Sequence, residues 1–96
     1  GSEMVTVHVE AKYRPGEKHP ASSREKENKQ GGGYLLAYSA DQEFPYRFEL
    51  IDSSRLLRGG KIISADDLPT PCTARVTFQR LKSGYSNVLT LEVLAL

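Results

Sequence analysis

Met4-Val-Thr-Val-His-Val-Glu10 alternates strictly between apolar and polar residues. Its three valines share one face, and a period of two with β-branched residues predicts a half-buried strand. The same alternation returns at Thr73–Arg80 and at Asn87–Leu94, on either side of a short turn. These three stretches indicate a protein built from β-sheet.

Two further strands are predicted nearer the start of the chain, at Tyr34–Ser39 and Phe44–Ile51. In the second of these strands, Phe48 and its alternate neighbours occupy one face. Arg47 and Glu49 occupy the opposite face. Between the opening strand and Tyr34 lies a polar segment with a run of three glycines at 31–33, which predicts a long loop.

The segment after Ile51 carries weaker signals. Asp52-Ser-Ser is a candidate cap for a single helical turn through Leu57, which Gly59-Gly60 would end. Lys61–Ser64 is a candidate short strand, and 66–71 is predicted to be a loop. With about five strands and at most one helical turn, the chain is predicted to be all-β, and OB-type, SH3-like and other small barrels all fit.

A chain of 96 residues makes one domain, predicted to span residues 4–96. Residues 1–3 have the composition of a remnant left by cloning, with Met4 as the native start. A domain this small has a thin core, so we expect a homodimer.

The net charge is only +1, but the charges are segregated. Lys12 to Lys29 contains six Lys or Arg against three Glu. Arg55, Arg58 and Lys61 form a second basic group, and a third follows at Arg75, Arg80 and Lys82. Basic segments with acids held elsewhere create a local positive potential, as in nucleic-acid-binding proteins. The alternative is a set of solvated surface charges.

The sequence contains no motif that predicts a catalytic site. The glycine run precedes a strand rather than a helix, so it does not predict a phosphate-binding turn. His and Cys lack metal-ligand spacing, and no nucleophile–base set is indicated. We therefore expect no enzyme, no cofactor and no metal. The single Cys72 fits a reducing cytoplasm, and no apolar run is long enough to predict a membrane span.

Basic residues are interleaved with aromatic ones, in Tyr13-Arg14, in Lys29 followed by Tyr34, and in Lys82 followed by Tyr85. Single-stranded nucleic acid binds to such patterns, because cations follow the phosphates and bases stack on rings. The competing interpretation is that tyrosines are simply common in strands.

The order of these features resembles the gene V single-stranded-DNA-binding proteins of filamentous bacteriophages, from Met4 to Leu94. The resemblance is carried by the opening strand and by Arg24 followed by Lys29-Gln-Gly-Gly-Gly-Tyr34. Glu43-Phe-Pro45 and the hairpin around Ser83-Gly-Tyr85 complete it. The segment 52–71 is longer than its counterpart in that family, and Glu92 stands where the family has a basic residue.

The resemblance implies a five-stranded OB-like barrel that coats single-stranded DNA cooperatively as a two-fold dimer, in the cytoplasm of a bacterial host during phage DNA replication. Arg24 and Lys29 would meet phosphates, and Tyr34 would stack on a base. Phe44 would contact neighbouring dimers, and Tyr85 would reach a base held by the partner subunit. The predicted site comprises Arg14, Arg24, Lys26, Lys29, Tyr34, Phe44, Arg80, Lys82 and Tyr85.

Two alternatives stay open from the sequence. RNA would satisfy the same stacking and phosphate contacts, since only a contact to the 2′-hydroxyl distinguishes it from DNA. A protein-binding β-module that offers an edge strand or the 55–64 segment to a partner would also be consistent with the near-neutral charge.

Overall fold

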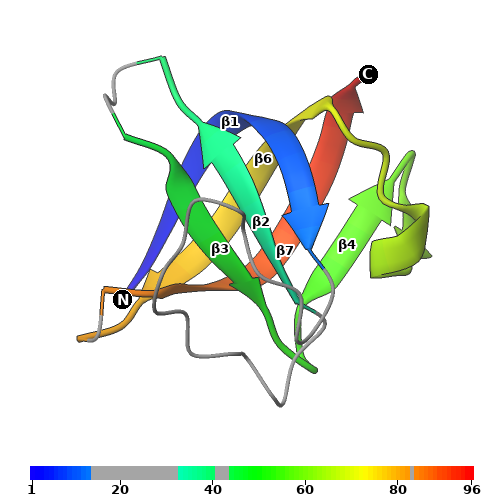
Figure 1. Cartoon of the computed structure of the whole chain (residues 1–96). Helices are drawn as coiled ribbons and strands as arrows, with labels where there is room; N and C mark the ends of the chain where they lie inside the picture. The colour runs from blue at the N-terminus through cyan, green and yellow to red at the C-terminus, as the bar shows by residue number, and fades with distance from the viewer. Residues whose placement is uncertain (14–32, 41–43, 83) are drawn as a thin grey trace.

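The computed structural model describes residues 1–13, 33–40, 44–82 and 84–96, and Figure 1 shows the chain traced from blue to red. Arg14, Arg24, Lys26 and Lys29 of the predicted site lie outside the described residues. The elements, in chain order, are β1 (Ser2–Tyr13), β2 (Gly33–Tyr38), β3 (Tyr46–Leu50), β4 (Arg55–Arg58), β5 (Lys61–Ile63), the 3₁₀ helix η1 (Ala65–Asp67), β6 (Cys72–Arg80) and β7 (Ser86–Ala95).

Five of the strands close into a ring. β1 pairs in antiparallel fashion with β2 on one side and with β6 on the other. β2 continues to β3, and β6 continues to β7. A parallel pairing of β3 with β7 closes the ring. This arrangement confirms the predicted all-β, five-stranded OB-like barrel.

Along β1 and β6, the residues that the alternation placed inward fill the barrel interior, whereas in β7 a register shift buries Val88 in place of the expected Leu89. Val7 and Val9 of β1 are buried, as are Val76 and Phe78 of β6. The ring centroids of Phe48 and Phe78 lie 5.0 Å apart at a tilted angle, a favourable separation for aromatic pairs. Phe48 of β3 and Phe78 of β6 come from strands that are not paired with each other, so their contact packs two sides of the ring together.

The predicted helical turn through Leu57 is wrong. Residues 55–58 form β4, which pairs in parallel with β7 and in antiparallel fashion with β5. Ser54 does not cap a helix, because its hydroxyl accepts a hydrogen bond from the Ile51 amide and donates one to the Val88 carbonyl. Leu56 is buried opposite Leu91, so an available edge of β7 overrides the local capping signal.

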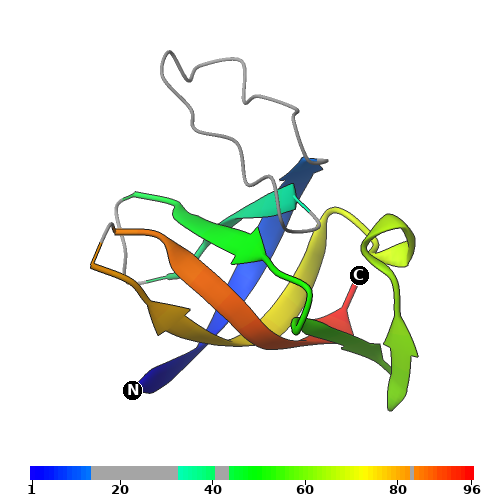
Figure 2. The same cartoon turned by 90° about the horizontal axis from the view of Figure 1, so that it is seen from below.

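The β4–β5 hairpin stands to one side of the barrel (Figure 2). Its two-residue turn is Gly59-Gly60, with φ values of 60° and 80°. A two-residue turn with two positive φ angles matches the twist of a hairpin, and glycine adopts it without strain. The short strand predicted at Lys61–Ser64 is confirmed as β5, whereas part of the expected loop forms η1 instead.

No helix among the described residues is both long and apolar enough to cross a lipid bilayer.

Candidate nucleic-acid interface

The outer surface of β2 and β3 carries a cluster of aromatic and charged side chains. Tyr34 lies across from Tyr13 of β1 on one side and from Glu49 of β3 on the other. Side chains alternate along β2, so Leu35 enters the core while Tyr34 stays on the outer face. β2 runs between β1 and β3, so Tyr34 is flanked by both strands.

Tyr34 is in contact with a ring and with a cation. Its ring stacks on that of Tyr13, with centroids 4.8 Å apart and planes 18° apart. The guanidinium carbon of Arg47 lies 3.8 Å from the Tyr34 ring centroid. A cation this close to the face of an aromatic ring is attracted by the ring quadrupole. Arg47 is therefore held diagonally across the strand pair from Tyr34.

Arg47 also brings the last hairpin into the cluster. Its guanidinium carbon lies 5.1 Å from the ring centroid of Tyr85. The parallel pairing of β3 with β7 sets Phe48 beside Ser86, which places the preceding residue of each strand, Arg47 and Tyr85, next to each other. Two aromatics that the sequence predicted as base-stacking residues, Tyr34 and Tyr85, thus lie on either side of one arginine.

The turn before Tyr85 holds it in this position. The Leu81 amide donates a hydrogen bond of 2.8 Å to the Tyr85 carbonyl, and the Gly84 amide donates one of 3.0 Å to the Leu81 carbonyl. Gly84 has a φ of 91°, a conformation that favours glycine over residues with a Cβ. The glycine therefore sets the path by which Tyr85 turns toward Arg47.

An acid completes the group that we call the aromatic–arginine cluster: Tyr13, Tyr34, Arg47, Glu49 and Tyr85. Arg47 Nε donates to Glu49 Oε2 at 2.5 Å. The two side chains are 17% and 4% exposed, respectively. They lie on the face that the alternation predicted, but they are covered rather than solvated. A buried ion pair requires close pairing, because desolvation of either charge alone is costly.

The placement of Tyr34 bears on its predicted role. The residue is only 4% exposed, with Tyr13 and Arg47 against its ring. A base that stacks on Tyr34 therefore has to take the place of one of these neighbours. Tyr85 is only half-buried, so its ring is the more accessible of the two predicted stacking platforms.

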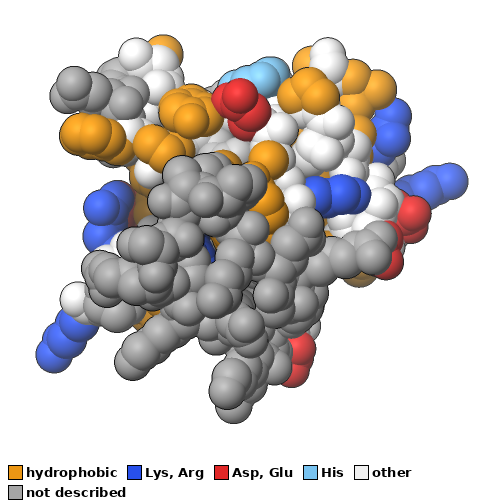
Figure 3. Space-filling model, in the orientation of Figure 1, with side chains coloured by type: hydrophobic (Ala, Val, Ile, Leu, Met, Phe, Trp, Pro, Cys, Tyr) orange, Lys and Arg blue, Asp and Glu red, His pale blue; other side chains and the backbone are white. Residues whose placement is uncertain are grey.

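The structure places the other described residues of the predicted site outside the cluster. Lys82 is exposed in the same turn as Tyr85. Arg80, at the end of β6, donates from Nε to Glu3 Oε2 at 3.1 Å. Phe44 precedes β3 and is largely exposed. Among the described residues, the Lys and Arg side chains seen in Figure 3 lie at separate places on the face.

Sequence reasoning missed Arg47 and Glu49 as site residues. A signal for them exists, because opposite charges two residues apart on a strand share a face. The alternation does not report which other side chains cover that face. Arg47 contacts Tyr34 and Tyr85, which are distant from it in sequence.

Lys12 belongs to the basic run but has a structural role in the barrel. Its ammonium donates to the carbonyls of Ala65, Asp66 and Leu68 at 3.0, 2.8 and 2.8 Å. A lysine has three N–H donors, so these carbonyls engage all of them. The contact ties the end of β1 to η1 and its following residue.

Cys72 lies at the start of β6, buried in the core. Burial raises the pKa of its thiol, and the positive charge of Arg58 opposes that rise. A buried thiol with a raised pKa is a poor nucleophile. Across the described ranges, no three His, Cys, Asp or Glu side chains gather in a way that could hold a metal ion.

Fold and site together define a class: an OB-like barrel with an aromatic–arginine cluster on its β2–β3 face. OB-folds that bind oligonucleotides or oligosaccharides do so on the face of their second and third strands and on adjoining loops. No family model, curated protein or solved structure matches this chain. The ligand is therefore inferred from the chemistry of the cluster.

Proposed function

We propose that the protein binds single-stranded DNA without sequence preference, through the β2–β3 face of its barrel. The observation that carries the proposal is the placement of Tyr34 and Tyr85 on either side of the Arg47 guanidinium. Rings stack on any base, and Arg47, whose charge is paired with Glu49, packs against both rings. Two tyrosines held in this way, with the exposed Lys82 in the turn before Tyr85, fit a ligand in which bases and phosphates alternate.

The resemblance to the phage gene V proteins supports the biological setting of this proposal. In that setting the protein coats the replicating genome cooperatively, as a homodimer in the bacterial cytoplasm. Basic residues of the 14–32 segment would then add phosphate contacts to those of Lys82. A single barrel of this size has a thin core, which is a second reason to propose a dimer.

Titration with oligo(dT), followed by tyrosine fluorescence, tests the proposal. The chain has five Tyr and no Trp, and three of these tyrosines belong to the cluster. We expect quenching by single strands, a weak response to duplex, and a log–log salt slope of about −0.7 for each phosphate neutralised. An unchanged tyrosine fluorescence at low salt would contradict the proposal.

A pair of variants isolates the stacking contribution. Tyr85→Leu should weaken oligo(dT) binding by about 1–3 kcal/mol, because a stacked base contributes that much per ring. Tyr85→Phe keeps the ring and should bind as the wild type does. Equal binding by both variants would mean that Tyr85 does not stack on a base. Oligo(U) of matched length reports any preference between RNA and DNA.

A protein-binding module is the competing function. β5 pairs only with β4 among the described strands, so its outer edge could accept a strand from a partner. That edge is only three residues long, and very short edge strands are a means of avoiding such pairing. The nucleic-acid proposal is therefore the one we favour.

A further inference from the structure

Tyr13 and Tyr34 form a stacked pair that has the geometry of a base on an aromatic ring. They are direct register partners in the pairing of β1 with β2. Their ring planes differ by 18° and their centroids lie 4.8 Å apart. Direct cross-strand partners are close enough for aromatic side chains to interact, and nucleobases stack on rings through the same flat faces. The Tyr13 ring therefore occupies a position that a base on Tyr34 could take.

The two neighbours of the Tyr34 ring differ in how firmly they are held. Tyr13 reaches the ring from β1 and Arg47 from β3, the strands on either side of β2. Displacement of Arg47 would also break its contact with Tyr85 and its ion pair with Glu49. The Glu49 carboxylate would then be buried without that cation, which is costly. We therefore expect Arg47 to stay in place when a ligand binds.

Tyr13 is the easier of the two neighbours to displace. It is the last residue of β1, and it is only half-buried. A change of rotamer moves its ring without breaking the backbone pairing of the strands. The stack of Tyr13 on Tyr34 is lost in this movement, and a base that takes the vacated face restores a stack on Tyr34.

The geometry points to an exchange: in the free protein Tyr13 covers the Tyr34 ring, and on binding a base of the single strand displaces Tyr13 and stacks in its place. This inference rests on the proposed function and deepens it, because it names the residue that competes with the ligand. It also explains how a ring that is only 4% exposed serves as a stacking platform. The internal stack opposes binding, because the two tyrosines have to separate before a base can stack.

The first test compares the affinities of two variants of Tyr13. Tyr13→Ala uncovers Tyr34, and we expect it to bind oligo(dT) about 2- to 10-fold more tightly than the wild type, because no aromatic pair has to separate. Tyr13→Phe keeps the stack and should match the wild type. Fluorescence anisotropy of dye-labelled oligo(dT) measures the affinity independently of the number of tyrosines.

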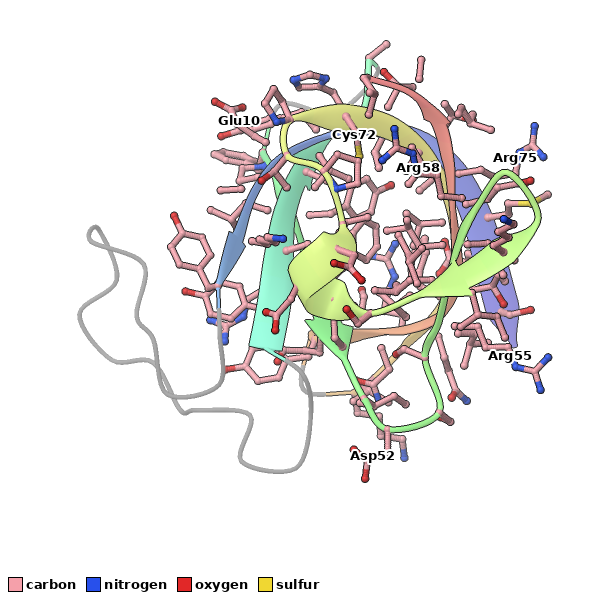
Figure 4. The ribbon with its side chains drawn as sticks, turned by 90° about the vertical axis from the view of Figure 1, so that its right-hand side faces the viewer. Glu10, Asp52, Arg55, Arg58, Cys72 and Arg75 are labelled. Carbon is pink, nitrogen blue, oxygen red and sulfur yellow. The ribbon has the colours of Figure 1, made fainter. Side chains whose placement is uncertain are left out.

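Two remote substitutions serve as controls. Tyr38→Ala removes an exposed ring from the other end of β2. Arg55→Gln changes a side chain that extends from the side of the barrel away from β2 (Figure 4). Neither substitution uncovers Tyr34, so neither should strengthen binding. Tighter binding by either control, to the same extent as by Tyr13→Ala, would contradict the exchange.

Nitration of tyrosine by tetranitromethane, located by mass spectrometry of peptides, follows the exchange in the wild type itself. In the free wild type we expect Tyr34 to be protected, whereas Tyr13→Ala should expose it to nitration. Saturating oligo(dT) should increase the nitration of Tyr13, which is released, while a base keeps Tyr34 protected. Reduced nitration of Tyr13 on binding would mean that the ligand covers Tyr13 rather than displacing it, and would overturn the inference.

The outcomes separate this inference from the proposed function. If the wild type binds oligo(dT) and Tyr13→Ala binds equally or more weakly, Tyr13 does not compete with a base, and the proposed function stands without the exchange. If neither protein binds, the proposed function fails together with the exchange. Circular dichroism shows whether Tyr13→Ala has folded, and the nitration of the wild type decides the question if that variant has not.

Discussion

Arg47 and Arg58 each lie on a strand that runs parallel to β7, yet their environments are opposite. Arg47 is covered, lies against two aromatic rings and forms an ion pair with Glu49. Arg58 is exposed and faces a second cation, Lys61. The first arrangement satisfies the charge within the fold, whereas the second leaves the charge exposed beside another cation. Positive charges that look alike in the sequence thus divide into ion-paired and solvent-exposed ones.

The largest effect on stability should come from breaking the ion pair between Arg47 and Glu49. Arg47→Met leaves the Glu49 carboxylate buried without its ion-pair partner, and we expect a loss of about 3 kcal/mol in the free energy of unfolding. Urea denaturation followed by circular dichroism measures it. Arg58→Met, on the exposed hairpin, should change stability by no more than about 0.5 kcal/mol.

A double variant shows whether the charge or the packing is responsible. Replacing both residues, as Arg47→Met with Glu49→Leu, removes the pair without leaving an unpaired charge, and it should recover most of the lost stability. A double variant as unstable as the single one would place the role of Arg47 in its stacking contacts. Arg47 would then differ from Arg58 only through its contacts with the aromatic rings of Tyr34 and Tyr85.

Lys12 offers a second structural cation, with an expected effect of about 2 kcal/mol. Lys12→Met keeps the aliphatic stem but removes charge-assisted hydrogen bonds to the carbonyls of Ala65, Asp66 and Leu68. Amide hydrogen exchange should accelerate around η1 more than in β6. Uniform acceleration of amide exchange, or a stability loss below about 0.5 kcal/mol, would contradict a structural role for Lys12.

The sequence predicts the walls of the barrel better than its outer surface. Alternation along β1 and β6 identified Val7, Val9, Val76 and Phe78 as inward, because burial of one strand face leaves a period-two pattern. The same pattern assigned Glu49 to the face opposite Phe48 but could not reveal that Glu49 is 3% exposed. Cover from another part of the chain leaves no local trace.

The segment after Ile51 failed for a related reason. Serine is a common helix-capping residue, so Ser54 favoured a helix. No residue close to Ser54 in the sequence indicates that the edge of β7 is open for pairing. Its partner, the Val88 carbonyl, lies in the last strand. The candidate site divides in the same way: Tyr34 and Tyr85 were identified from their basic neighbours, whereas Arg47 between them required the closed ring.

A smaller effect, confined to alkaline pH, concerns Cys72 beside the hairpin. Burial raises the pKa of the folded thiol above its ordinary value of 9.0. As the pH rises past that value, the unfolded chain loses the thiol proton first, so the unfolded state binds fewer protons and stability falls. Cys72→Ala should lose less stability over this range, as measured by urea denaturation at several pH values. Parallel stability profiles of the wild type and Cys72→Ala against pH would contradict a raised pKa of Cys72.

The smallest change should have the opposite sign from the first. Arg58→Gln removes the repulsion with Lys61, and we expect the protein to become more stable by about 0.3 kcal/mol at low salt. Added salt should shrink this gain, since it screens exposed charges. Arg55→Gln, which lacks a facing cation, should show no such gain.

A stabilised Arg58→Gln variant would show that Arg58 and Lys61 repel each other across the turn. Loss of stability in Arg58→Gln would instead mean that Arg58, like Arg47, is held by contacts within the fold. The opposition between the two arginines would then fail.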